Sequence, residues 1–179
     1  MAFSNRLELQ YKLIESSKNI AAVGANIMLM DSEGKEIGSR RYPHSSKDLK
    51  SCLFRYSSFA HPVVVFRKDI FDEVGGYDPK YSPTEDLDLW FRLGRKYKFG
   101  SIPETLLKYR LDEKSSSHRA LKDVEILVFK IRLKAIIKYG YIPSLYDIFY
   151  NFVQFITLWI TPSKYRAKIY NLLRNNDLI

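Results

Sequence analysis

The chain has 179 residues, of which 46% are hydrophobic and 27% charged, a composition typical of a folded globular protein and not of a disordered one. Its single cysteine, Cys52, excludes an intrachain disulfide and any zinc site that needs two cysteines from this chain. The formal net charge is +9, and most of the excess lies after residue 112. It favours a polyanionic neighbour, either nucleic acid or anionic lipid, or else a solvated basic helix face.

The first part of the chain alternates helical and extended patterns. A capping-box spacing at Asn5–Glu8, with apolar residues at positions 7, 11 and 14, predicts the first helix. The expected elements, in chain order, are a helix over residues 5–17, a strand over 20–31, its hairpin partner over 35–39, a short helix over 46–54, a strand over 63–66, a short helix that stops at Gly75 and Gly76, an acidic helix capped by Thr84, and a strand over 98–111.

The remainder of the chain has only helical patterns. We expect a long helix from near Ser117 to Tyr139, an aromatic-rich helix bracketed by Pro143 and Pro162, and a short basic helix at the end. The fold class is therefore α/β over residues 1–113, followed by an all-helical C-terminal extension over residues 114–179.

Three carboxylates begin the acidic helix in "SPTEDLDLWFRLG". Glu85 and Asp88 share a side of the helix with Arg92, which predicts a solvated face with an Asp88–Arg92 pair. Asp86 instead heads the apolar stripe, which consists of Leu89, Trp90 and Leu93. A carboxylate in that position either caps the free N–H groups of the first turn or acts as a general base at the floor of a cleft.

The stretch "GGYDPKYSPTEDLDLWFRLGRKYKFGSIPETLLKYRL" resembles the C-terminal half of the catalytic domain of family 2 glycosyltransferases of the GT-A type. The shared pieces are a Gly-Gly-aromatic-Asp turn, Glu-Asp at a helix start, a Leu-Trp-x-Arg-Leu run, and a strand with a proline and a Tyr-Arg pair. Upstream, "FRKDIFDEVGGYD" and "NRLELQ" extend the resemblance to about residues 5–115. It implies a partial GT-A fold, with a mixed sheet and flanking helices.

The resemblance also implies roles for individual residues. Asp86 would be the base that takes the proton of an acceptor hydroxyl in an inverting transfer, and Glu85 would bind the acceptor or orient Asp86. His61 would approach the substrate or serve as a structural residue at a strand edge, and Trp90 would contact a sugar or belong to the core. After the Tyr-Arg pair, where many members of the family have a His, this sequence departs from the pattern with Leu111 and Asp112. Asp112 either binds Mg²⁺ or Mn²⁺, the family's cofactor, or is a solvated loop residue.

In this family an N-terminal half with an Asp-x-Asp element binds the nucleotide and the metal, and no such element precedes Arg6. We therefore expect a truncated or split form, with the main metal ligands outside the chain and the N-terminal half as a missing partner. The other implied partners are a nucleotide-sugar donor and a glycan or lipid-linked acceptor, as in cell-envelope polysaccharide synthesis. Two other classes stay open: an inert carbohydrate-binding or scaffolding module, and a basic nucleic-acid binder. The latter lacks any recognised motif, so we expect no nucleic-acid partner.

The aromatic-rich segment Ile148–Ile160 is too short to span a bilayer, which needs about 20 apolar residues. Aromatic side chains followed directly by basic ones are typical of the headgroup boundary of a membrane. We expect a cytoplasmic protein, held at the inner face of the membrane if this helix binds lipid. The alternative is that the aromatic stripe packs on the catalytic core.

Overall fold

The computed structural model describes residues 1–111, 121–161 and 165. In these ranges the chain forms an α/β fold with a mixed four-stranded sheet. The elements are α1 Arg6–Glu15, β1 Ile20–Met30, β2 Glu36–Arg40, α2 Ser46–Ser51, β3 Val65–Phe66, α3 Lys68–Glu73, α4 Glu85–Lys96, β4 Lys98–Arg110, α5 Leu121–Tyr139 and α6 Leu145–Ile160, with 3-10 helices at Cys52–Phe54, His61–Val63 and Pro79–Tyr81.

Strand β1 is the centre of the sheet. It pairs with β4 in parallel along almost its whole length, and its other edge is shared by β2 and β3, both antiparallel and at opposite ends of β1. The pairing of β1 with β4 is irregular where Pro103 interrupts the ladder. There the buried Asn26 donates a side-chain hydrogen bond to the Pro103 carbonyl (2.6 Å) and accepts one from the Tyr42 N–H. The amide of Asn26 thus satisfies backbone groups that the broken ladder leaves free.

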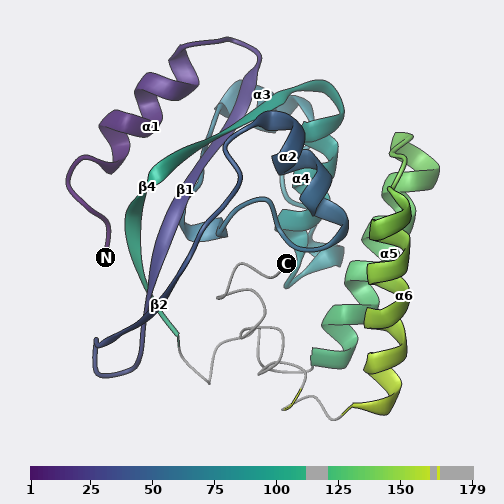
Figure 1. Ribbon diagram of the computed structural model, residues 1–179. Helices are drawn as coiled ribbons and strands as arrows, with labels where there is room; N and C mark the ends of the chain where they lie inside the picture. Colours follow the sequence, from purple (N-terminus) through teal and green to yellow (C-terminus); the bar gives the residue numbers. More distant parts are fainter. Residues whose placement is uncertain (112–120, 162–164, 166–179) are drawn as a thin grey trace.

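Helices cover both faces of the sheet (Figure 1). Helix α1 lies on one face, where Ile14 joins the apolar side chains of β1 and β4 in one core cluster. Helices α2 and α4 lie on the other face, and α5 packs behind α4, with α6 outermost. Helix α4 is therefore buried on most of its circumference, between the sheet and α5.

Most predicted elements are confirmed, but the detail of α1 is wrong in two ways. Asn5 has helical dihedral angles and makes no side-chain cap, so the capping box is absent, and Glu8 pairs with Lys12 instead. The expected apolar face is also misplaced. Leu7 and Tyr11 are about two-thirds exposed, and the helix turns other residues, among them Gln10, toward the sheet.

Two further expectations need adjustment. The strand expected over residues 63–66 is shorter, because His61–Val63 forms a 3-10 turn and only Val65–Phe66 pairs with β1. The beginning of the long helix near Ser117 and the basic helix at the end of the chain lie outside the described residues. The described part of the long helix runs to Tyr139, and Gly140 follows it with a positive φ of 72°.

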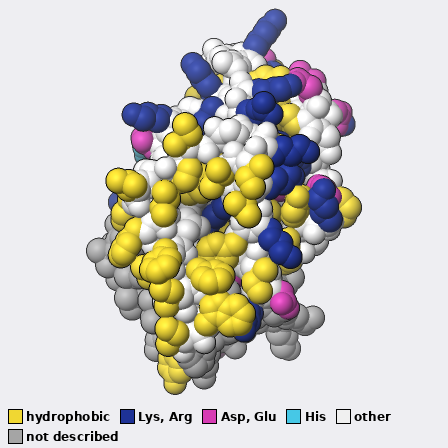
Figure 2. Space-filling view, turned by 90° about the vertical axis from the view of Figure 1, so that its right-hand side faces the viewer, with side chains coloured by type: hydrophobic (Ala, Val, Ile, Leu, Met, Phe, Trp, Pro, Cys, Tyr) yellow, Lys and Arg dark blue, Asp and Glu magenta, His cyan; other side chains and the backbone are white. Residues whose placement is uncertain are grey.

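Helix α6 is inverted relative to an ordinary surface helix. Its polar side chains face the protein: Asn151 and Gln154 accept hydrogen bonds from Arg132, and Asp147 pairs with Arg55. Its large apolar side chains face outward, with Phe149 64% exposed. Other exposed hydrophobic residues of α6 include Leu145, Tyr146, Ile148, Phe152, Phe155, Trp159 and Ile160. Figure 2 shows hydrophobic side chains gathered on this side of the molecule, with Lys and Arg beside them.

Among the described residues, no helix is both long enough and apolar enough to cross a bilayer.

Candidate active site

The candidate catalytic carboxylate lies in the first turn of α4. Thr84 precedes the helix, but its hydroxyl donates to the Tyr81 carbonyl (2.9 Å) and does not cap the helix. The Oδ1 atom of Asp86 accepts a hydrogen bond from the Leu87 N–H at 2.8 Å. Asp86 is half-buried, and the first turn of the helix holds its carboxylate in place.

The environment of Asp86 raises its pKa above the ordinary value of an aspartate. Burial is the largest cause, and the charge of Glu85 adds to it, while His61 and the Leu87 N–H act in the opposite direction. A carboxylate whose proton affinity is raised in this way is a better general base than a solvated one.

Two aromatic side chains lie beside this carboxylate. His61 Nε2 and the Tyr77 hydroxyl are 2.8 Å apart, and their rings are tilted against each other. The pKa of Tyr77 is raised, first by burial and then by the charges of Asp86 and Glu85. The structure thus brings together four polar side chains from three segments: the turn before β3, the loop after α3, and the start of α4.

Gln10 of α1 holds the turn that carries His61 in position. The side-chain amide of Gln10, which is fully buried, donates to the Val23 carbonyl of β1 (3.0 Å) and to the Val63 carbonyl (2.7 Å). Val63 is in the same 3-10 turn as His61. Gln10 therefore ties α1, the central strand and the His61 turn together, which gives the Gln of "NRLELQ" a structural role.

Glu85 carries a carboxylate oxygen without a partner. Its Oε2 atom is buried and makes no hydrogen bond to any of the residues that the structure describes. A buried carboxylate oxygen is costly to leave unpaired. Next to Asp86, it is a hydrogen-bond acceptor available to the hydroxyl of a ligand.

Trp90 is a core residue in this structure, which favours one of the two interpretations of the sequence. Its side chain is fully buried. The indole packs edge-on against Phe59 (5.3 Å between ring centroids) and His61 (6.3 Å). Trp90 supports His61 from the interior and offers no surface to a sugar.

The solvated face expected for Asp88 is wrong. Asp88 is 0% exposed, and its two carboxylate oxygens are bound by Lys134 Nζ (2.5 Å) and Arg92 Nε (2.8 Å). Arg92 also donates to the carbonyls of Val74 and Gly76 at 2.6 Å each. The reason is that α5 covers the side of α4 that sequence periodicity assigns to water. The Asp88 cluster joins α4, α5 and the Gly-Gly turn.

The residues described here do not form a metal site. Asp112 lies outside the described residues, and within those residues no three His, Cys, Asp or Glu side chains converge as metal ligands. The described residues therefore do not fit the divalent cation that the resemblance implies, and we derive no step through a metal.

Sequence reasoning missed Tyr77 and Lys134. Tyr77 is the aromatic residue of the Gly-Gly-aromatic-Asp turn, and its partnership with His61 depends on two segments that meet only in the fold. Lys134 is a lysine within an apolar helix, between the buried residues Arg132 and Ala135. A cation on the packed side of a helix indicates a buried carboxylate on the neighbouring element, and this signal could have identified Asp88.

No protein-family model matches the chain. It is 32% identical over 130 residues, 71% of its length, to the O-antigen biosynthesis glycosyltransferase WbnJ of Escherichia coli, covering 50% of that protein. It is 26% identical over 171 residues, 91% of its length, to the uncharacterized glycosyltransferase MJ1057 of Methanocaldococcus jannaschii, covering 58% of it. The matched part of the chain thus spans 50% and 58% of the length of these two relatives. By sequence, it is similar to part of a glycosyltransferase, and its α/β fold with a mixed sheet is compatible with that relation.

Proposed function

We propose that this chain is the acceptor-side part of an inverting glycosyltransferase of family 2 and GT-A type. The observation that carries the proposal is the arrangement around Asp86: a half-buried carboxylate with a raised pKa, next to His61 and the unpartnered Glu85 Oε2. The names of the two relatives support a glycosyltransferase, and the chain matches only 50% and 58% of their lengths. The donor nucleotide would be bound by sequence beyond these 179 residues, whether in the same polypeptide or in another.

In the proposed reaction, the oxygen of an acceptor hydroxyl attacks the anomeric carbon of the donor sugar. A carbon–oxygen bond forms as the bond to the nucleotide diphosphate breaks, and the diphosphate leaves with that electron pair. Asp86 accepts the hydroxyl proton, and Glu85 orients the acceptor through its free oxygen. His61, whose Nε2 lies 2.8 Å from the Tyr77 hydroxyl, lowers the pKa of Asp86 and so opposes the larger effect of burial. General base catalysis of this kind contributes about 10²–10⁴-fold.

The pH dependence of transfer tests this assignment. As the pH is lowered, kcat/KM should begin to fall at a pH above the ordinary pKa of aspartate, because burial raises the pKa of Asp86. Replacing His61 with alanine removes a group that lowers this pKa, so the limb should move to higher pH. A limb that stays in place in His61→Ala would exclude Asp86 as the titrating base.

The exposed face of α6 supports a second proposal, that the protein lies on an anionic membrane surface. Polar side chains such as Asn151 turned inward and phenylalanines turned outward are the reverse of what water favours. The acidic side chain of α6, Asp147, is buried against Arg55, while the ammonium group of Lys122 on α5 lies over the exposed ring of Trp159, 3.9 Å from its centroid. Positive charge beside apolar surface complements anionic headgroups over an acyl boundary, whereas two copies of this face would bring like charges together.

Co-sedimentation with vesicles tests the membrane proposal. Binding to vesicles containing an anionic lipid should weaken with salt and be lost on neutral vesicles. Phe152→Ser should weaken it about tenfold, because one phenylalanine leaves the acyl boundary. Leu7→Ser is the control, since Leu7 is 67% exposed on α1. The proposal would be overturned if the chain does not bind the vesicles and instead forms a dimer that Phe152→Ser dissociates.

A further inference from the structure

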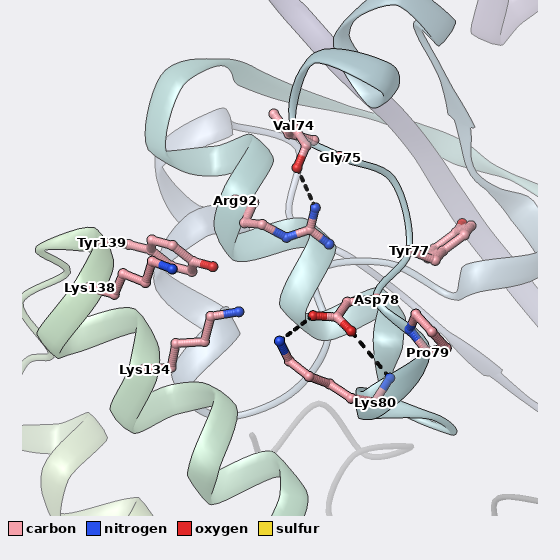
Figure 3. A pocket seen from close by; sticks show the side chains of 10 residues that line it. All are labelled: Val74, Gly75, Tyr77, Asp78, Pro79, Lys80, Arg92, Lys134, Lys138 and Tyr139. Carbon is pink, nitrogen blue, oxygen red and sulfur yellow. Dashed lines mark hydrogen bonds and ion pairs between the residues drawn. The ribbon is translucent and has the colours of Figure 1, made fainter.

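A basic pocket lies beside the loop that carries Tyr77 (Figure 3). It is a hollow of about 410 Å³ between the loop after α3 and the helices α4 and α5. Its polar lining consists of Tyr77, Asp78, Lys80, Arg92, Lys134 and Lys138, with Tyr139 beside them.

Two of the four cationic side chains, Arg92 and Lys134, are paired with a buried carboxylate of the protein. Arg92 and Lys134 share the single negative charge of Asp88, so this group keeps one unit of positive charge. Although burial acts in the opposite direction, contacts with Asp88, Tyr139 and Tyr81 raise the pKa of Lys134, which is therefore charged at any physiological pH.

The other two cations lie at the edges of the hollow. Lys80 forms an ion pair with Asp78 at 2.6 Å, which balances its charge. Lys138 is exposed, and no hydrogen bond or ion pair joins it to another described residue. The charge of Lys138 and the one unit left over from Arg92, Lys134 and Asp88 give the pocket two uncompensated positive charges.

Tyr77 lies between this pocket and the candidate base. It lines the hollow and binds His61 through its hydroxyl, and Asp86 and Glu85 raise its pKa. The loop that carries Tyr77 thus separates the pocket from the candidate base, and the Tyr77 ring is directed away from the cations of the pocket (Figure 3).

We propose that this pocket holds the phosphate or diphosphate group of a phosphorylated acceptor. Two excess positive charges match such a dianion, and lysine binds phosphate well as a point charge. The inference rests on the proposed function, since it names the substrate class for the acceptor side of that site. The anion would be fixed by Lys138 and the Asp88 group, and the sugar or hydroxyl that it carries would extend past Tyr77 toward Asp86.

Calorimetric titration of the chain with inorganic pyrophosphate tests the pocket without any transfer reaction. We expect saturable, salt-sensitive binding that Lys138→Gln weakens by about tenfold. Lys130→Gln is the matched control, because Lys130 is an exposed lysine of the same helix outside the pocket. Circular dichroism should be unchanged in both variants. No saturable binding up to about 10 mM, or equal losses in the two variants, would overturn the proposal.

Further titrations identify the source of the phosphate. Tighter binding of a short-chain lipid phosphate or of a sugar phosphate supports an acceptor of that kind. Tighter binding of a nucleoside diphosphate than of pyrophosphate would overturn the acceptor assignment, because the pocket would then serve the donor. Asp86→Asn should leave pyrophosphate binding intact, so a failure of the proposed base and a failure of this pocket give different results.

Discussion

Replacing Asp88 with asparagine should destabilise the protein strongly. The variant keeps the size of the side chain but removes the one negative charge that Lys134 and Arg92 share in the interior. Asp88 is 0% exposed, and the side chains of its partners are only 18% and 14% exposed. Both cations would therefore lose their counterion in a place where water replaces it poorly.

Breaking a buried ion pair on one side costs about 3–5 kcal/mol. We expect the lower end, about 3 kcal/mol, because Arg92 keeps its hydrogen bonds to two carbonyls and Lys134 stays near the faces of Tyr81 and Tyr139. For a chain of this length such a loss lowers Tm by about 6–12 °C.

Denaturant unfolding followed by circular dichroism measures this change. Asp72→Asn is the control, because Asp72 pairs with Lys68 on an exposed helix face and its loss should cost less than about 0.5 kcal/mol. The double variant Asp88→Asn with Lys134→Met should recover part of the loss, since one uncompensated cation is removed. An Asp88→Asn variant whose free energy of unfolding lies within about 0.5 kcal/mol of the wild-type value would refute the reasoning.

Two further predictions concern stability. Asp86→Asn should be at least as stable as the wild type at pH 7. Burial raises the folded-state pKa of Asp86, so the charged carboxylate destabilises the folded wild type. The difference in unfolding free energy between variant and wild type should vanish at a pH below the ordinary pKa of aspartate, which denaturant unfolding at pH 7 and at that lower pH would measure. Gly24→Ala should destabilise by about 1–3 kcal/mol, because the added Cβ would lie 2.3 Å from a ring carbon of the buried Phe59. An unchanged Tm in Gly24→Ala would show that Phe59 moves freely.

The order and type of the elements could be predicted from local patterns, because the residues of a segment largely determine whether it forms a helix, a strand or a turn. The run from Ile20 to Met30 is apolar except for Asn26 and forms the central strand, which is buried on both faces. Two consecutive glycines marked the end of α3, and both have positive φ. The periodicity of α1 failed because a buried glutamine, Gln10, takes an inward position that the pattern assigns to apolar residues.

The candidate site was only partly predictable, for a different reason. Asp86 was found at the border of the apolar stripe, and its half-buried position agrees with that reasoning. Asp88 was misassigned because a helical wheel assumes one solvated side, whereas α4 is covered by the sheet and by α5. The contact of His61 with Tyr77 joins positions 16 residues apart, and no local period encodes it.

The turnover of Asp86→Asn tests the central claim most directly. It is measured with the whole polypeptide or complex that carries this chain, a nucleotide-sugar donor and an acceptor, and compared with Asp72→Asn as a control for folding. Our account predicts that kcat falls by at least about 100-fold in Asp86→Asn, with unfolding stability preserved, and stays near the wild-type value in Asp72→Asn. A folded Asp86→Asn enzyme that keeps more than about a tenth of the wild-type kcat would contradict it.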